Sequence, residues 1–140
     1  MMQVNVQPRR QMIQSALTRH PHAMVPTTLR LWEQLTPELV AIIGEGGFRP
    51  LYARSVRLAC QQYPWMAHDA QALDASGRLA QLQTCLEAQE PAQAHQASMA
   101  LFTIFLDMLA SLIGETLTNH LLQSAWPQET VQTPAKDFPR

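Results

Sequence analysis

The sequence predicts an all-α protein: a compact bundle of about five or six helices whose last helix is long and apolar. Three observations lead to this class. Alanine, leucine and glutamine dominate the composition, and all three are good helix formers. Apolar residues recur at three- and four-residue steps, whereas the alternating pattern of a strand is absent from the sequence. Proline and glycine stand between the apolar stretches, where helices begin and end.

The first two helices are predicted to begin near prolines. Pro8 suits the first turn of a helix that extends to about residue 19. Val25-Pro26-Thr27 opens the second helix. Further along, Thr36-Pro37-Glu38 either begins a new helix, with Thr36 as its N-cap, or kinks a continuous one. The predicted core-facing residues of the first helix are Met12, Ile13, Ala16 and Leu17.

Glycines are predicted to end this helical region and to separate it from the next helix. Gly44-Glu45-Gly46-Gly47 is expected to form a sharp turn because glycine adopts positive φ freely. Phe48-Arg49-Pro50 then starts a helix that Tyr63-Pro64 stops. Residues 65–75 are interpreted as a connector.

The C-terminal half is predicted to contain two helices. Ser76 is the expected N-cap of a helix that ends near Glu90. Pro91 then begins the last and longest helix, which reaches about Ala125 and would be about 50 Å long if unbroken.

A short motif occurs twice in the chain. Ile42-Ile43-Gly44-Glu45 recurs as Leu112-Ile113-Gly114-Glu115. This repeat predicts two related helical units packed about a pseudo-twofold axis, unless the match arose by chance in a chain rich in alanine and leucine. In each unit, the Gly-Glu pair should lie at the C-terminal end or at a bend of a core helix. Apolar residues before the motif match as well, since Trp32, Leu35 and Leu39 correspond to Phe102, Phe105 and Leu109.

Length, composition and charge restrict the function classes. The 140 residues suit one domain, expected over residues 1–126, with a flexible tail over residues 127–140. A net charge of -1 provides no long-range field for nucleic acid or an anionic bilayer, so neither is an expected partner. The apolar run from Met99 to Ile113 is shorter than the ~20 residues of a membrane span and is interpreted as a core helix.

Cysteine usage and the first residues indicate the compartment. Cys60 and Cys85 form no CxxC motif, and two cysteines do not make a disulfide framework. The first residues lack the charged start and the unbroken apolar run of a secretory signal. We therefore expect a cytoplasmic protein.

No complete catalytic or metal-binding motif occurs in the sequence. The glycine-rich turn with Arg49 has elements of an anion cradle but matches no phosphate-binding motif, and a tight interhelical turn is the preferred interpretation. Glu45 and Glu115 lack the histidine three residues later that di-metal helical bundles use. HExxH and GxSxG are absent, so we predict no metal, no cofactor and no enzymatic activity.

Two stretches, LVAIIGEGGFRPLYARSVRLACQQYPWM and LIGETLTNHLLQSAWP, resemble helical segments of uncharacterised bacterial proteins and accessory regions of multidomain signalling proteins. The resemblance covers about residues 30–66 and 100–127. It implies a bacterial helical module that works beside signalling domains, and it implies no activity, catalytic residue or cofactor.

The preferred hypothesis is a non-enzymatic accessory or regulatory interaction module that self-associates through a helical face as a homodimer, with a signalling protein as a further partner. The alternative is a small-ligand or anion sensor whose pocket lies between the two repeated units. Histidine phosphotransfer at His95 is less favoured because the HxLKG pattern of such domains is missing. The ligand-binding residues predicted for the sensor are Glu45, Arg49, Tyr52, Arg54, Trp65 and Glu115.

Overall fold

The computed structural model describes residues 8–18, 23–67 and 75–127. These residues form five α-helices and one short 3-10 helix and contain no strand, which confirms the predicted all-α bundle. Beyond Pro127, the tail predicted over residues 127–140 lies outside the described residues. In chain order, the elements are α1 (Pro8–Thr18), α2 (Met24–Ala59), η2 (Pro64–Met66), α3 (Ala75–Glu87), α4 (Pro91–Ile113) and α5 (Glu115–Ala125).

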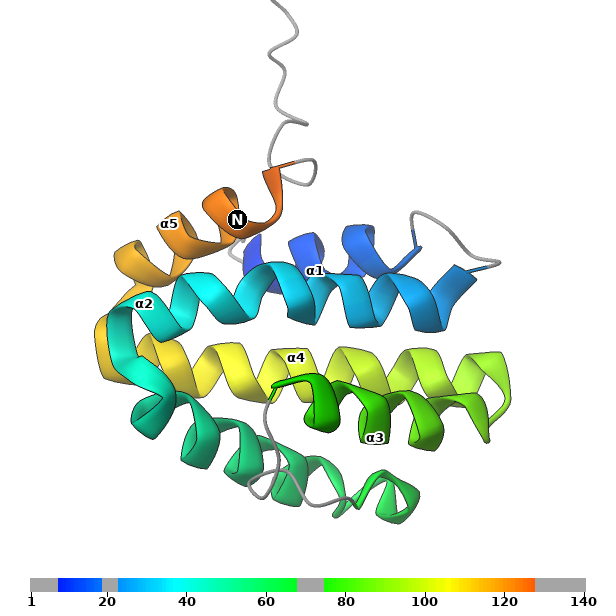
Figure 1. Ribbon diagram of the computed structural model, residues 1–140. Coiled ribbons are helices and arrows are strands. Elements are labelled where there is room, and N and C mark those ends of the chain that lie inside the picture. The colour runs from blue at the N-terminus through cyan, green and yellow to red at the C-terminus, as the bar shows by residue number, and fades with distance from the viewer. Residues whose placement is uncertain (1–7, 19–22, 68–74, 128–140) are drawn as a thin grey trace, which may run out of the picture.

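Helix α4 runs through the middle of the bundle (Figure 1). It contacts α1, α2 and α5, while α3 packs on α2 and η2. By length and composition, α4 is the one described helix that is long and apolar enough to cross a membrane. Its central position accounts for much of this apolar character. The buried side chains that it contributes to the core include Leu101, Phe102, Phe105, Leu106 and Leu109.

Helix α2 consists of two segments, residues 24–43 and 45–59, that meet at a break at Gly44 (φ 73°, ψ 167°). Pro37 lies inside the first segment, and the helix continues through it, so Thr36 does not begin a new helix. The Thr36 hydroxyl donates a hydrogen bond to the carbonyl oxygen of Trp32, 2.7 Å away. This bond to the preceding turn is a common use of threonine within a helix.

The four-residue turn predicted at the break is wrong in its extent. Only Gly44 leaves the helical conformation, so the helix restarts at Glu45 rather than at Phe48, and Gly46 and Gly47 are helical. A Cβ atom on Gly47 would lie 3.0 Å from the Cβ atom of Ile43. Glycine at position 47 therefore allows the two segments to approach closely across the break.

The predicted C-terminal helix from Pro91 to about Ala125 is broken at its Gly-Glu pair, so the long apolar helix ends at Ile113. Gly114 (φ 96°, ψ 156°) separates α4 from α5, and α5 folds back onto α2 and α4. The Gly114 N–H donates a hydrogen bond to the carbonyl oxygen of Ala110 at 2.8 Å. The N–H and the hydroxyl of Thr118 both donate to the carbonyl oxygen of Gly114, at 3.1 Å and 2.8 Å. The break thus lies between two hydrogen-bonded helix ends.

Trp126, the residue after α5, joins the C-terminal helix to the two long helices. Its side chain is 0% exposed. The indole N–H donates a hydrogen bond to the carbonyl oxygen of Leu31 in α2, 3.0 Å away. The indole ring packs edge-on against Phe102 of α4, with 5.4 Å between the ring centroids. Trp126 therefore holds α5 against both α2 and α4.

The two copies of the repeated motif share one backbone conformation. Gly44 and Gly114 are the positive-φ residues of the described part of the chain, and both combine this φ with an extended ψ. That region of φ/ψ space is open essentially to glycine alone. Both breaks lie at the same end of the bundle (Figure 1). The prediction that each Gly-Glu pair marks the end or a bend of a core helix is confirmed.

Corresponding residues of the two copies also pack on one another. Trp32 stacks on Phe102, its counterpart in the second copy, with 4.4 Å between the ring centroids. At the level of helices, α1 packs on α4 and α3 packs on α2. We call α1 and α2 unit 1, and α3, α4 and α5 unit 2. The two units have the same order of elements and reciprocal contacts, as a pseudo-twofold axis between α2 and α4 would produce.

Candidate functional site

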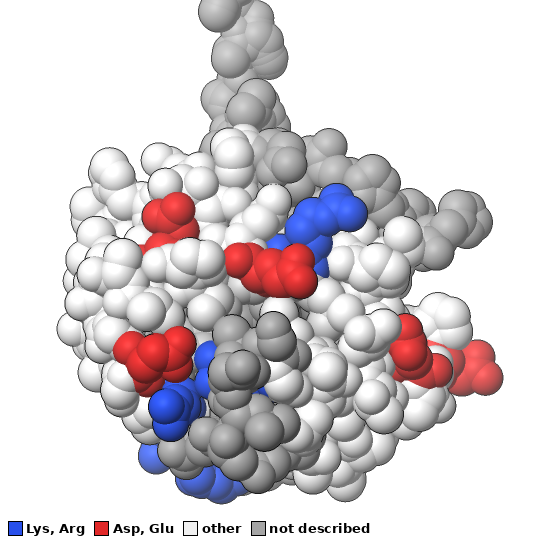
Figure 2. Space-filling view, in the orientation of Figure 1, with Lys and Arg blue, Asp and Glu red and all other residues white. Residues whose placement is uncertain are grey.

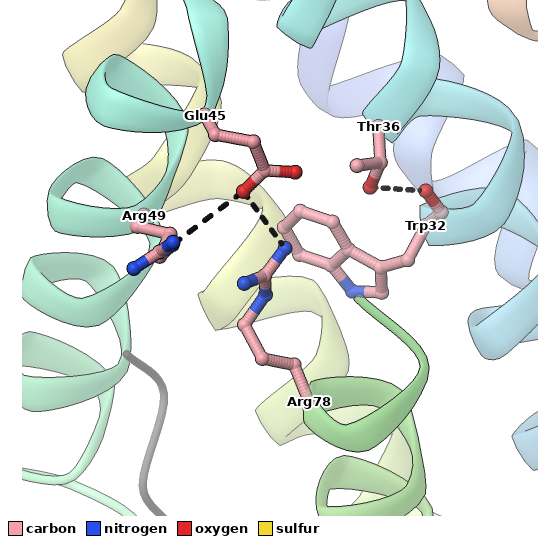
Figure 3. Close-up of polar contacts among 5 residues, drawn as sticks. All are labelled: Trp32, Thr36, Glu45, Arg49 and Arg78. Carbon is pink, nitrogen blue, oxygen red and sulfur yellow. Dashed lines mark hydrogen bonds and ion pairs between the residues drawn. The ribbon is translucent and has the colours of Figure 1, made fainter. Parts of the chain in front are cut away.

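Two of the predicted ligand-binding residues, Glu45 and Arg49, form an ion pair. Glu45 starts the second segment of α2, and its Oε1 atom lies 3.5 Å from Nε of Arg49 and 3.8 Å from Nη2 of Arg78 (Figure 3). The side chains of Glu45 and Arg49 are 49% and 48% exposed. A carboxylate in the first turn already interacts favourably with the helix dipole, so it disfavours a second anion at this position.

Sequence reasoning missed Arg78, the one buried charged side chain of the described residues. Arg78 extends from α3, and its guanidinium carbon lies 5.0 Å from the centroid of the Phe48 ring. A guanidinium over an aromatic face is a favourable cation–π arrangement. Together with the contact to Glu45, it connects α3 to the second segment of α2 (Figure 3). No local signal distinguishes Arg78 from the exposed arginines, because its burial depends on how α3 packs on α2.

Tyr52 lies in the aromatic core. Its side chain is 2% exposed. Its ring meets Trp32 edge-on at 5.2 Å and stacks on Phe48 at 5.9 Å, measured between centroids. Burial raises the pKa of the Tyr52 phenol well above its ordinary value of 10.0, and the positive charge of Arg78 opposes this shift in part. The folded protein therefore keeps Tyr52 neutral.

We expect the raised pKa of Tyr52 to make the protein less stable at alkaline pH. In the unfolded chain a tyrosine loses its proton near pH 10, whereas folded Tyr52 keeps it. The contribution of neutral Tyr52 to the free energy of unfolding is therefore complete below pH ~10. Above that pH it falls by up to about 1.4 kcal/mol per pH unit. Unfolding free energies measured by urea denaturation at neutral and alkaline pH should show this loss.

The variant Tyr52→Phe should lose clearly less stability at alkaline pH than the wild-type protein. Tyr63→Phe is the control, because it removes a partly exposed phenol and keeps Tyr52. Burial also raises the pKa of the Cys60 and Cys85 thiols, but they are present in all three proteins and cancel in the comparison. An equal alkaline loss in Tyr52→Phe and wild type would contradict the prediction.

The other three predicted ligand-binding residues lie on three different elements, α2, η2 and α5. Arg54 is exposed on the second segment of α2. Trp65, in η2, is partly buried and packs edge-on against Tyr63 with 5.9 Å between the ring centroids. Glu115 is exposed at the start of α5.

The two larger grooves described here lie elsewhere in the structure, and none of the six predicted residues lines either one. Groove A, of about 690 Å³, lies between α1, the C-terminal end of α2 and α4. Groove B, of about 340 Å³, lies between α3 and the first segment of α2. Groove A is lined in part by Arg10, Gln14, Tyr63, His95, Met99 and Thr103. Groove B is lined in part by Leu29, Glu33, Leu79 and Gln83.

Among the described residues, no group of three or more histidine, cysteine, aspartate or glutamate side chains is placed to bind a metal ion. Cys60 and Cys85 are partly buried free thiols. His20 and His22, considered with the scattered histidines, lie outside the described residues. His95 is partly buried in the wall of groove A.

Large apolar side chains are exposed at one end of the bundle. Within the described residues they are Ile42, 47% exposed, Leu112, 69% exposed, and Leu117, 39% exposed. Ile42 and Leu112 correspond in the repeat and come shortly before Gly44 and Gly114, and Leu117 follows soon after the second break. We call the end of the bundle that carries Ile42, Leu112 and Leu117 the break end.

Figure 2 shows one face of the molecule, on which charged side chains are few and wide uncharged areas separate them.

Comparison of the chain with protein-family models, with curated proteins and with solved structures found no match.

Proposed function

We propose that this protein is a non-enzymatic accessory or regulatory interaction module that self-associates as a homodimer through the break end. The observation that carries the proposal is that the exposed apolar residues Ile42, Leu112 and Leu117 all lie within three residues of Gly44 or Gly114, whose breaks are at the same end of the bundle. Single exposed apolar residues are common on protein surfaces, whereas a group of them in one region is typical of an interaction surface.

The symmetry of the break end favours a second copy of this chain as the partner. Ile42 and Leu112 occupy corresponding positions in the two units, so the break end is itself arranged about a pseudo-twofold axis. A twofold dimer uses the same patch on both subunits. Glu45 and Glu115 are exposed beside the glycine breaks and supply polar groups at the margin of the apolar residues, as the rim of an interface requires. Burial of the apolar area would contribute roughly 25 cal/mol per Å².

We expect Leu112→Asp to weaken self-association at least about tenfold, because a charge would have to be desolvated in the interface. Ile42→Asp should have the same effect, since the two positions correspond. Sedimentation velocity from micromolar to millimolar protein measures the dimer population. Both residues are exposed in the single chain, so the variants should keep the helical circular dichroism spectrum of the wild type.

Ala92→Asp is the matched control for these variants. Ala92 is exposed in the first turn of α4, at the opposite end of the helix from Leu112, and the substitution adds the same charge. It should leave the dimer population unchanged. A wild-type protein that stays monomeric at millimolar concentration would contradict the proposal. Equal weakening of self-association by Ala92→Asp and Leu112→Asp would contradict it as well.

We also propose that the module acts beside signalling domains in the bacterial cytoplasm. The resemblance of its two apolar stretches to accessory regions of signalling proteins supports this context. Cys60 and Cys85, both free thiols, fit a reducing compartment. Binding assays with purified signalling proteins encoded beside its gene test the idea. Direct binding to one of them supports it, and a lack of binding to all of them counts against it.

A further inference from the structure

We propose that groove A binds a small anionic molecule that carries a phosphate or carboxylate group. Its volume of about 690 Å³ falls within the range of roughly 300–1,000 Å³ that is usual for small-molecule sites. Its lining from α4 comes from residues 95–104 and ends eight residues, about two helical turns, before Leu112. The site is therefore separate from the surface proposed for self-association.

The lining of groove A has the chemistry of an anion site. Arg10 and His95 are its basic side chains, and its described lining contains no carboxylate. A guanidinium binds carboxylate and phosphate groups through paired, charge-assisted hydrogen bonds. Met99 and Ile104 add apolar surface for the body of a ligand. Neutral hydrogen-bonding groups come from the side-chain amides of Gln14, Gln61, Gln62 and Gln96.

Two further arginines lie next to groove A on α2. Arg54 comes one helical turn before Leu58, a lining residue of the groove on the same face of α2, and Arg57 comes four residues before Gln61, a lining residue just beyond the end of the helix. Both are exposed. Between described residues, no ion pair is recorded for Arg54, Arg57 or Arg10. The positive charge around groove A is therefore available to a ligand.

Groove B gives a comparison within the same molecule, because it occupies the corresponding position in the other unit. The buried residues of the short helices align, Ile13 and Leu17 of α1 with Leu82 and Leu86 of α3. This alignment matches two residues of groove A, Arg10 and Gln14, with two residues of groove B, Leu79 and Gln83. The repeat in the long helices likewise matches Met99 and Thr103 with Leu29 and Glu33.

The two grooves differ in charge at these matched positions. Groove B has Leu79 where groove A has Arg10, and it has the carboxylate of Glu33 where groove A has Thr103. The fold itself therefore produces a groove at both places, while the basic character belongs to groove A alone. This difference is the main reason to assign groove A, and not groove B, to an anion.

An NMR titration of the full chain with inorganic phosphate, ADP and citrate tests the proposal. At least one of these anions at millimolar concentration should shift the amide signals of residues that line groove A. Binding of citrate alone would assign a carboxylate ligand, and binding of phosphate or ADP a phosphate ligand. If none of the three shifts these signals, the proposal is overturned.

Arg10→Leu places in groove A the side chain that groove B has at the matched position. It should weaken binding of the active probe about tenfold or more. Arg30→Leu is the control, because Arg30 is exposed on α2 and lines neither groove, yet the variant removes the same charge. Equal weakening by both variants would show that net charge governs binding and would overturn the assignment. Leu112→Asp leaves groove A intact, so this proposal and the dimer can fail independently.

Discussion

Replacement of Trp126 by alanine should lower the free energy of unfolding by about 3–5 kcal/mol. The side chain is fully buried, packs on Phe102 and donates its indole N–H to the Leu31 carbonyl oxygen. Its loss would leave a large cavity between α5, α2 and α4. Urea denaturation followed by far-ultraviolet circular dichroism measures the effect without depending on tryptophan fluorescence.

Two further variants separate the contributions of Trp126. Trp126→Phe keeps much of the apolar volume and removes the hydrogen bond, so the loss should be smaller than with alanine. Trp65→Ala removes a tryptophan that is only partly buried and should also cost less. The interpretation fails if Trp126→Ala is no more destabilising than Trp65→Ala.

Replacement of Gly114 by alanine should lower the free energy of unfolding by roughly 1–3 kcal/mol, and Gly44→Ala should have a similar effect. Both glycines have a positive φ with an extended ψ, which strains any residue that has a Cβ atom. A Cβ atom at either position would meet no atom within 4 Å. The loss would therefore report backbone strain and not a steric clash. Thermal and urea denaturation both measure it.

Gly46→Ala is the matched control for the two breaks. Gly46 is also free of neighbours within 4 Å of a Cβ atom, but its backbone is helical. Alanine is favoured over glycine in a helix by roughly 0.5–1 kcal/mol, so this variant should be stabilised. Gly44→Ala and Gly114→Ala proteins as stable as the wild type would show that the breaks are not held in this conformation in solution.

The starts of α1 and α4 were predictable from the sequence because their signals are local. Proline fits the first turn of a helix whatever packs around it, and Pro8 and Pro91 are indeed the first residues of α1 and α4. The breaks were predictable only in part. Three neighbouring glycines indicated the first break, whereas Gly114 stands alone in a strong apolar stripe, and only the repeated motif indicated a break there. What makes Gly114 a break is the packing of α5 back onto α2, which local patterns do not contain.

The candidate sites depend still more on contacts between distant parts of the chain. Tyr52 is predicted to bind a ligand in a pocket between the repeated units, but its ring packs against Trp32 and Phe48 in the core. Groove A combines residues from α1, the end of α2 and α4. Its basic side chains, Arg10 and His95, are far apart in sequence and match no motif. Only the repeat gave an indirect signal, because it predicted two related units whose differences can be compared.

The reciprocal packing of the two units has a consequence for how the chain folds. Phe48 of α2 packs against Phe105 of α4, and Trp126 beyond α5 binds back to Leu31 of α2. Repeats in a solenoid contact only their neighbours and can form one after another. Here each half lacks part of its own core until the other half is in place. The two units therefore fold cooperatively. A nascent chain cannot complete its core before Trp126 has been synthesised.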